Sequence, residues 1–322
     1  MSSLQHAERQ VASDTAGSRA DFLAVLDHLG VLQFSGEDAE AFLQGQLSCD
    51  VARVSLGSST YGAYCTPKGR MLASFLLWRN EAAFFMALSR DIVSPVQKQI
   101  SRFVLRSRVK VSNASDSMLL AGAAGAQTER ALAGMFPDLP AKSGEVRSAP
   151  GTGSVARLGD GRLMVALPAE GAVQRLESCA ELTDGRVWRW LDIRQGLPLV
   201  TAATQDRFIP QMANLEEIGG VSFEKGCYTG QEVVARAQHL GSVKRRMFLA
   251  NVPAPAQAGD ELYSDDLGDQ ASGVVVNAEI SPDGGYDLLA VVQSASRERS
   301  TVHLKALGGP VLAFRALPYG AA

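Results

Sequence analysis

From Lys244 to the C-terminus, the chain consists of short β-prone runs separated by turn residues at close intervals. The runs include "MFLANVP", "SGVVVNAEI", "YDLLAVVQ" and "PVLAFRALP". Many short strands joined by frequent turns are typical of β-sandwiches and small barrels. We therefore predict that residues 244–322 form a separate all-β domain with the architecture of a small β-barrel.

The preceding part of the chain mixes strand and helix patterns. An alternating stretch ending at Phe34 feeds a helix predicted to begin at Ser35 or Gly36, and "TYGAYCTPKGRMLASFLLWRN" predicts a hairpin with "TPKG" as its turn. After Met118 the mixture returns, with a strand "RLMVALP", a helix "AQTERALAGMF" and a Gly/Ser/Pro-rich loop "KSGEVRSAPGTGS". We predict that residues 1–20 form a disordered or frayed arm. Residues 21–117 and 118–243 are predicted to form two α+β domains, which can exchange segments.

Length and composition are those of an ordinary globular protein. The 322-residue chain is long enough for a substantial core, and 46% hydrophobic with 20% charged residues excludes gross disorder. The net charge of -3 argues against a general nucleic-acid coating protein, so we expect no stable nucleic-acid binding. Apolar runs are shorter than the roughly 18 residues of a membrane helix, and the N-terminus lacks a signal-peptide core. We expect a cytoplasmic monomer with no membrane partner.

The cysteines and histidines do not have the spacing of a metal site. The four cysteines, Cys49, Cys65, Cys179 and Cys227, include no C-x-x-C pair, and the four histidines form no H-x-x-x-H pair. We therefore predict no permanent metal. In a reducing cytoplasm, Cys49, Cys65 and Cys179 are expected to be small buried apolar residues, whereas Cys227 lies in the motif "KGCYTGQE".

A run of cations follows the next helical pattern. Apolar residues recur at helical spacing from Asp91, with Pro95 in the first turn. Lys98, Arg102 and Arg106 are four residues apart, which places them along one face of the predicted helix. That face is either simply solvated or a seat for an anionic ligand tail or RNA phosphates, and the sequence leaves both interpretations open.

The segment "KGCYTGQE" contains a helix start. Thr229 and Glu232 have the T-x-x-E spacing of a capping box, in which each side chain accepts a bond from a backbone N–H at the helix end. A helix is therefore predicted to begin at Gly230. Cys227 then lies just before the positive end of the helix dipole and two residues from Lys225, and both effects favour the thiolate. A reactive thiol and a buried spacer before a well-capped helix remain the two interpretations.

The longer stretch "FIPQMANLEEIGGVSFEKGCYTGQEVVARAQHLGSVKRRM" resembles the signature of the YgfZ family of folate-binding proteins, related in fold to the glycine cleavage aminomethyltransferase. The K-G-C-Y-x-G-Q-E motif is specific, and "GVLQFSGEDAEAFLQGQLSCDV", "CTPKGRM", "GLPLV" and "LPY" support it. The resemblance covers nearly everything after the N-terminal arm. It implies an α+β fold of the T-protein type, a three-domain cloverleaf in which two related α+β domains and a C-terminal small β-barrel surround a folate channel.

The resemblance also implies a role in making or repairing iron–sulfur clusters, notably in enzymes that thiomethylate tRNA, with tetrahydrofolate or a derivative as cofactor. Iron–sulfur client enzymes or cluster-assembly proteins would be the partners. The functional cysteine of the family maps onto Cys227, and the supporting motif residues are Lys225, Gly226, Tyr228, Thr229, Gly230, Gln231 and Glu232. Candidate folate contacts are Gln46, Arg70, Arg194, Gln211 and Asn214, with Lys98, Arg102 and Arg106 for an anionic tail.

Two positions depart from the pattern of the aminomethyltransferase branch. Where that branch has an aspartate pair, this chain holds Ala73 and Ser74, so the transferase reaction is not expected. Where the branch recognises the pterin through a glutamate, this chain has Arg194. A guanidinium has donors only and cannot accept bonds from the amino-pyrimidine edge. Either other groups hold the pterin, or Arg194 receives the tail carboxylate of a reversed ligand.

Three functions therefore compete. The preferred hypothesis is a folate-binding accessory protein of iron–sulfur metabolism that is not a conventional enzyme and uses Cys227 as its working thiol. A folate-dependent aminomethyl transferase is the enzyme alternative. A non-catalytic scaffold or binding module, whose cysteine merely packs, is the third.

Overall fold

The computed structural model describes residues 21–239 and 243–319. The predicted arm, residues 1–20, lies outside these described residues. The chain divides into two compact units, each built from separated segments. Among the described residues, unit 1 holds residues 21–43, 51–60 and 75–188, and unit 2 holds residues 44–50, 61–74, 189–239 and 243–319. The domain boundaries expected after residues 117 and 243 stay predictions.

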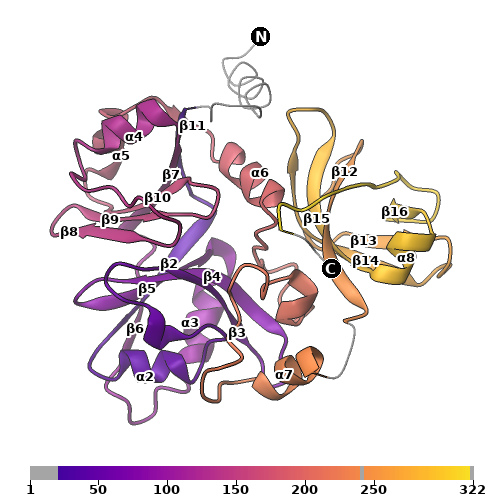
Figure 1. The fold of residues 1–322 in the computed structure, drawn as a ribbon, viewed down its shortest axis with the longest axis horizontal. Coiled ribbons are helices and arrows are strands. Elements are labelled where there is room, and N and C mark those ends of the chain that lie inside the picture. The colour runs from indigo at the N-terminus through magenta and orange to yellow at the C-terminus, as the bar shows by residue number, and fades with distance from the viewer. Residues whose placement is uncertain (1–20, 240–242, 320–322) are drawn as a thin grey trace. The chain divides into compact units, whose positions relative to one another are not determined.

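Unit 1 contains a six-stranded sheet in the order β11-β1-β7-β10-β9-β8, in which only the β1–β11 pair is parallel. The strands are β1 (Phe22–Val25), β7 (Met118–Ala124), β8 (Val146–Ala149), β9 (Gly153–Arg157), β10 (Leu163–Pro168) and β11 (Leu182–Thr183). Two helices, α4 (Ala126–Leu132) and α5 (Ala172–Glu177), lie beside this sheet (Figure 1). Leu132 and Leu176 of these helices pack with Val165 of β10 in one apolar core.

A second group of antiparallel strands in unit 1 surrounds β2. The elements of this part are β2 (Leu29–Ser35), α2 (Ala39–Gln44), η1 (Val51–Arg53), β4 (Met71–Arg79), β5 (Ala83–Ser89), η2 (Arg90–Ile92) and β6 (Lys110–Asn113). β2 pairs with β5 and β6, and β5 pairs with the second half of β4. The helix after β2 begins later than predicted because Gly36 has a φ of +116°, and a Cβ there would lie 2.0 Å from the Arg108 carbonyl oxygen.

The predicted cationic helix face does not form. The helix α3 (Val93–Ser101) ends before the cation run does. Leu105 has a φ of +44°, a conformation through which no right-handed helix continues. Lys98 therefore lies on α3, whereas Arg102 is its C-cap and Arg106 lies in the turns beyond it. The prediction of three cations along one helical face is wrong.

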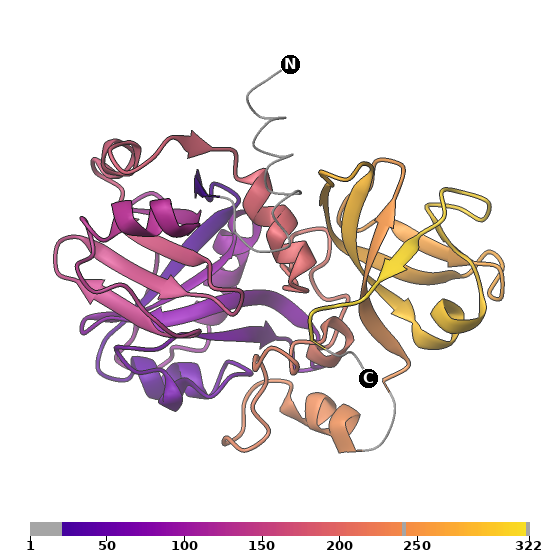
Figure 2. The ribbon, with the colours of Figure 1, turned by 45° about the horizontal axis from the view of Figure 1, so that its top comes forward.

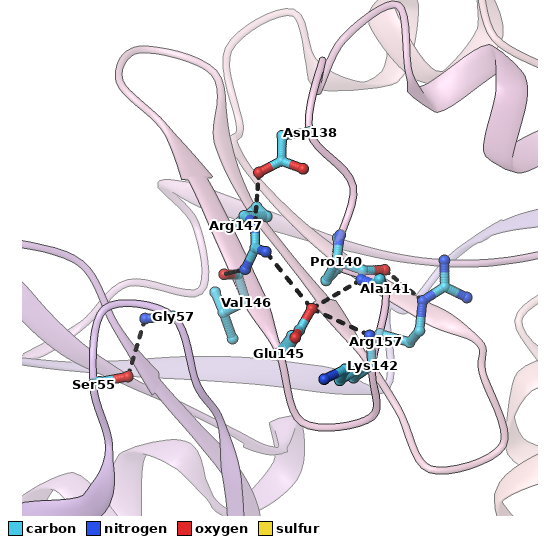
Figure 3. Close-up of polar contacts among 10 residues, drawn as sticks. All are labelled: Ser55, Gly57, Asp138, Pro140, Ala141, Lys142, Glu145, Val146, Arg147 and Arg157. Carbon is cyan, nitrogen blue, oxygen red and sulfur yellow. Dashed lines mark hydrogen bonds and ion pairs between the residues drawn. The ribbon is translucent and has the colours of Figure 1, made fainter.

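The Gly/Ser/Pro-rich stretch predicted as a loop contains the β8–β9 hairpin instead. Figure 3 shows the polar contacts that fix the turn before it. The Glu145 carboxylate accepts the N–H groups of Ala141 and Lys142 at 2.9 and 3.2 Å, and these bonds, Lys142 first, lower the pKa of Glu145. Arg147 pairs with Asp138 at 2.7 Å. Turn-forming composition did not exclude strands here, because the turn residues are confined to short segments before and between the two strands.

The C-terminal part of unit 2 is a six-stranded sheet in the order β16-β13-β14-β15-β12-β17. Its strands are β12 (Arg245–Val252), β13 (Glu261–Ser264), β14 (Ala271–Ile280), β15 (Tyr286–Gln293), β16 (Val302–Leu304) and β17 (Ala313–Arg315). The sheet curls (Figure 2) around an apolar core that includes Val252, Leu262, Val275 and Leu288. The predicted small β-barrel is confirmed as this curled sheet.

The last strand links the two edges of the curled sheet. The Leu304 N–H donates to the Pro310 carbonyl at 2.8 Å, and the Leu312 N–H donates to the Val302 carbonyl at 2.9 Å. Directly after these contacts with β16, the chain enters β17, which pairs with β12. Residues 310–312 therefore hydrogen-bond to β16 at one end of the sheet order, and the residues that follow them form β17 at the other end.

The remaining elements of unit 2 include those that contact the cysteine motif. The remaining elements are β3 (Thr60–Cys65), the first half of β4, the end of α6 (Arg186–Arg194), η3 (Pro210–Ala213), α7 (Gln231–His239) and α8 (Ser294–Arg299). β3 and β4 form the predicted hairpin, whose turn is closed by a 2.9 Å bond from the Gly69 N–H to the Thr66 carbonyl. The α+β class is confirmed. None of the helices in the described ranges combines the length and apolar character needed to cross a membrane.

Candidate functional site

The cysteine motif connects η3 to α7 and alternates between buried and exposed side chains. Lys225 and Tyr228 are buried, whereas Gly226 and Cys227 between them are exposed. The interpretation of Cys227 as a buried spacer is therefore wrong. The motif presents its thiol at the surface of unit 2 and inserts the side chains on either side of it into the interior.

Lys225 binds a backbone bend at residues 47–49. Its Nζ donates to the carbonyl oxygens of Leu47 at 2.8 Å and Cys49 at 2.7 Å, and it lies 5.2 Å from the centroid of the Tyr228 ring. Burial lowers the pKa of Lys225 to about 8, while Cys49 and Asp50 act in the opposite direction. From the sequence, the positive charge of Lys225 is expected to act on the Cys227 thiol. In the structure, the Lys225 ammonium donates to two carbonyl groups of the bend.

Ser48, at the centre of the same bend, makes the second set of contacts. Its hydroxyl donates to the Gly220 carbonyl at 2.7 Å and accepts the Ala63 N–H at 2.7 Å. Its carbonyl accepts the Ser222 N–H at 2.9 Å. The bend is therefore held between β3 and the segment that leads to Cys227. Sequence reasoning missed Ser48, because its partner Gly220 lies 172 residues away along the chain.

The helix after the motif begins at Gln231, one residue later than predicted. The side-chain oxygen of Gln231 accepts the Tyr228 N–H at 3.2 Å, so the bond expected from a Thr229–Glu232 capping box is made one position earlier along the chain. Gly230 has a φ of +85° and cannot be the first helical residue. The predicted capping box with Thr229 as N-cap is thus corrected to a contact between Gln231 and Tyr228.

Gly230 is fixed by the turn of the β3–β4 hairpin. A Cβ on Gly230 would lie 2.5 Å from the Thr66 carbonyl oxygen and 2.9 Å from the Cα of Gly69. A Cβ on Gly69, which has a φ of +70°, would lie 2.9 Å from the Cβ of Val233 on α7. The "CTPKGRM" and "KGCYTGQE" stretches therefore meet through two glycines, and this close approach explains why both residues lack a side chain.

Two further thiols lie buried near the motif in unit 2. Burial raises the pKa of Cys49 to about 12, although Lys225 opposes the shift, and burial raises the pKa of Cys65 to about 12. Burial also raises the pKa of Tyr228, whose phenol oxygen has no hydrogen-bond partner among the described residues. All three groups are uncharged at neutral pH. Burial of Cys49 and Cys65 confirms the expectation for them, whereas Cys179 in unit 1 is half-buried.

These surroundings predict the order in which the cysteines react. Cys227 should be alkylated by iodoacetamide well before Cys49 and Cys65, even at pH 9, because the two buried thiols stay protonated and covered. Cys179 should react at an intermediate rate. Limited alkylation followed by peptide mass spectrometry measures the order. Labelling of all four cysteines at one rate in urea provides the unfolded control, and labelling of Cys49 before Cys227 in the native protein would contradict the assignment.

Arg194, which departs from the glutamate of the aminomethyltransferase branch, lies beside a buried carboxylate. Its Nη1 is 3.7 Å from an oxygen of Asp287, which is fully buried. The other carboxylate oxygen is 3.3 Å from the guanidinium of Arg315. Trp190 Nε1 and Asn251 Nδ2 donate to Asp287 at 2.9 and 2.8 Å. The guanidinium of Arg194 therefore has a counter-charge within its own unit.

Sequence reasoning missed Asp287 altogether. The residue stands in "YDLLAVVQ", where it is the single charged side chain in an apolar strand. A lone carboxylate in such a strand is a signal of a buried partner, because an unpaired buried charge is costly. Its partners come from α6, β12 and β17, which are far apart in the sequence.

The remaining folate candidates differ in what their side chains leave unpaired. Asn214 donates to the Met247 carbonyl at 2.8 Å and accepts its N–H at 3.4 Å, so both amide atoms are engaged. Arg70 donates to the Arg207 carbonyl at 2.7 Å. Gln46 and Gln211 each carry a buried side-chain oxygen without a partner among the described residues. Buried acceptors of this kind fit a ligand with N–H donors, as the amino-pyrimidine edge of a pterin has.

Lys98, Arg102 and Arg106 are exposed in unit 1, whereas the other folate candidates belong to unit 2. The role of these cations toward an anionic tail stays a prediction. Within residues 21–239 and 243–319, no three or more His, Cys, Asp or Glu side chains are grouped to hold a metal ion. The expectation of no permanent metal likewise stays a prediction.

Similar proteins share the length and the fold of the chain. Residues 19–149 match the family described as the GCVT N-terminal domain. The chain is 31% identical to the tRNA-modifying protein YgfZ of Escherichia coli O157:H7 (strain EC4115 / EHEC), with 95% of each chain covered. It is 32% identical to the protein of the same name from Klebsiella pneumoniae (strain 342), with 92% of each covered.

Among solved structures, the chain is similar to the glycine cleavage system aminomethyltransferase T from Bartonella henselae. The TM-score is 0.75 at 20% identity, and the match covers 93% of this chain and 86% of that chain. The T-protein type of fold that the sequence predicts is therefore confirmed. At this identity the likeness concerns the fold alone.

Proposed function

This chain belongs to the YgfZ family, and from that premise we propose that it is a folate-binding accessory protein of iron–sulfur cluster assembly or repair. Its relatives are named tRNA-modifying proteins, so the proposed clients are iron–sulfur enzymes that modify tRNA. The observation that carries the proposal is the exposure of Cys227 on a segment whose neighbouring side chains are buried. A thiol presented in this way is accessible to a partner protein.

The contrast with the other cysteines of unit 2 supports Cys227 as the working residue. Cys49 and Cys65 are covered and protonated, which makes them poor nucleophiles and poor metal ligands at neutral pH. Cys227 combines accessibility with a backbone that is held on both sides. In this proposal the iron–sulfur cluster is cargo or substrate and belongs to the client enzyme.

Folate is the proposed ligand because unit 2 contains unpaired buried acceptors. The side-chain oxygens of Gln46 and Gln211 would hold N–H donors of the pterin, and Asp287, 3.7 Å from Arg194 Nη1, balances the charge of that guanidinium. A bound tetrahydrofolate supplies a carrier for one-carbon groups. The residues of this chain contribute binding and orientation.

Two positions argue against aminomethyl transfer as the activity. Ala73 is buried and apolar, and the Ser74 hydroxyl donates to the Pro198 carbonyl at 2.7 Å and accepts the Val200 N–H at 2.9 Å. Neither side chain offers a carboxylate to a substrate. The transferase alternative would therefore need its acid or base from another part of the molecule.

The role of Cys227 is tested by rescue of cells that lack their family member. Wild type should restore the activity of iron–sulfur tRNA-modifying enzymes, whereas Cys227→Ser should lose most of that rescue, because a serine hydroxyl does not replace the sulfur of a cysteine as nucleophile or metal ligand. Cys179→Ser is the matched control and should rescue fully. Parallel quantification of protein level and modified tRNA bases separates loss of function from loss of protein. Full rescue by Cys227→Ser would favour the scaffold alternative.

Folate binding is tested separately by calorimetry with tetrahydrofolate. Gln46→Leu should weaken binding about tenfold, because it removes one acceptor worth about 1–1.5 kcal/mol. It should not lower the stability of the free protein, since the oxygen has no partner to lose. The same change at the exposed Gln270 should leave the affinity unaltered. Absence of binding by the wild-type protein would remove folate from the proposal.

A further inference from the structure

The exposed thiol lies on a strap, residues 220–230, that is attached to the body of unit 2 near both of its ends. At the first end, Gly220 and Ser222 exchange hydrogen bonds with Ser48 at 2.7 and 2.9 Å. At the second end, Gly230 lies against the hairpin turn that contains Gly69. Cys227 stands between these attachments, so its position depends on what holds the middle of the strap.

Lys225 and Tyr228 are the two inward-directed residues of this middle part. The strap carries two charged side chains, of which Glu224 is exposed and Lys225 is buried. An ammonium leaves water at a high cost unless it is hydrogen-bonded, and Nζ meets two carbonyl oxygens at 2.7 and 2.8 Å. Tyr228 offers its ring to the same ammonium at 5.2 Å but has no hydrogen bond at its own phenol oxygen among the described residues. Lys225 therefore supplies two buried, charge-assisted hydrogen bonds to the middle of the strap.

The acceptors of Lys225 are themselves rigid. They flank Ser48 in the bend at residues 47–49, which is buried and bonded to β3 through both the backbone and the hydroxyl of Ser48. Two carbonyls on a fixed bend accept a charged donor in one narrow range of positions. The contact consequently restricts the strap two residues before the thiol, whereas an electrostatic influence on the thiol would not require these bonds.

We propose that Lys225 is a positioning residue, a latch that fixes the strap to the 47–49 bend and holds the Cys227 thiol in one orientation. The functional importance of the latch rests on the proposed function, in which Cys227 is the working thiol. The mechanical effect of the latch does not depend on it. Lys225 acts through the backbone and touches no reacting atom.

A nitroxide spin label on Cys227 tests the latch directly. In a full-length Cys179→Ser background the label should attach at Cys227, because Cys49 and Cys65 are buried. The spectrum with Lys225 present should contain an immobilised component. Lys225→Met keeps an unbranched side chain that is one heavy atom shorter and removes the N–H donors. It should cause loss of the immobilised component, because the strap detaches from the bend.

Two matched variants separate positioning from general weakening. Lys244→Met makes the same change at an exposed lysine and should leave the spectrum unaltered. Leu262→Ala removes a core side chain of the C-terminal sheet and lowers stability without touching the strap. It should also keep the immobilised component. Lys225→Gln, which retains a shorter N–H donor, serves if the methionine variant does not fold, and it should show partial loss of the component.

The outcomes separate the latch from the function. An unchanged spectrum in a folded Lys225→Met or Lys225→Gln variant overturns the latch, whatever the rescue experiment shows. Loss of the immobilised component in Leu262→Ala as well would overturn it too, because the effect would then be general. Loss confined to the Lys225 variants supports the latch. If these variants and Cys227→Ser nevertheless rescue cells fully, the latch stands and the proposed function of Cys227 fails.

Discussion

Replacing Asp287 with alanine should lower the free energy of unfolding by about 3–5 kcal/mol, because the change removes one partner of a buried charge cluster. The carboxylate is fully buried and lies within 3.3 and 3.7 Å of the guanidinium groups of Arg315 and Arg194. Its loss leaves two cations without their counter-charge. Donors on Trp190 and Asn251 also lose their acceptor. Urea unfolding followed by tryptophan emission measures the effect, and Trp190 reports on the site itself.

Asp283→Ala is the control for this prediction. Asp283 lies four residues earlier at an exposed position, and the same truncation there should change stability by less than about 0.5 kcal/mol. Arg194→Glu should also be strongly destabilising, because it places a second carboxylate beside Asp287. Restoring the glutamate of the aminomethyltransferase branch therefore needs a simultaneous Asp287→Asn change. A loss below about 1 kcal/mol in Asp287→Ala would mean that the cluster is hydrated and that its charges are screened.

The second large effect is expected at a glycine of the cysteine motif. Gly230→Ala should destabilise the protein by about 2–5 kcal/mol, the sum of a left-handed backbone penalty and steric overlap. A Cβ there would lie 2.5 Å from a backbone oxygen of Thr66, and backbone atoms cannot move aside as a flexible side chain can. The overlap should also separate α7 from the β3–β4 turn. Thermal and urea unfolding measure the first consequence, and faster proteolysis within the motif measures the second.

The same motif contains its own control. A Cβ on Gly226 would have no atom within 4 Å beyond its immediate chain neighbours, and the residue does not have a positive φ, so Gly226→Ala should be tolerated. The two alanine substitutions differ by only four positions in sequence. Equal destabilisation by Gly226→Ala and Gly230→Ala would contradict this prediction. It would show that the loss of stability does not depend on the contact between Gly230 and the hairpin turn.

The sequence predicted those features that depend on neighbouring residues. The β3–β4 hairpin follows from "TPKG" between two apolar runs, and the C-terminal sheet follows from short runs with regular turns. The first turn of α3 contains Pro95 as predicted, but the helix stops at Ser101. The four-residue spacing of the cations predicted that they share one helical face. The spacing does not reveal that Leu105, between the last two cations, has a left-handed backbone conformation through which the helix cannot continue.

The parts of the site that sequence could not supply depend on distant contacts. The start of α7 moved by one residue because Gly230 packs against Gly69, a contact between residues far apart along the chain. Local spacing proposed Lys225 as a charge for the thiol, whereas its acceptors are at Leu47 and Cys49. Helix and hairpin signals are local, but the partner of a buried charge is decided by tertiary structure.

The bond between Lys225 and Leu47 joins residues that are 178 positions apart. Unit 2 also draws its β3 strand from the first quarter of the chain and closes its curled sheet with residues 310–315. Contacts of such long range form late, because the ends of a long loop must meet before any of them contributes. During synthesis, the 47–49 bend therefore emerges long before Lys225, whose ammonium binds the carbonyl oxygens of Leu47 and Cys49. A newly made chain passes through an interval in which the bend lacks this donor, and the contact arises only after the Lys225 segment has been made and has packed against it.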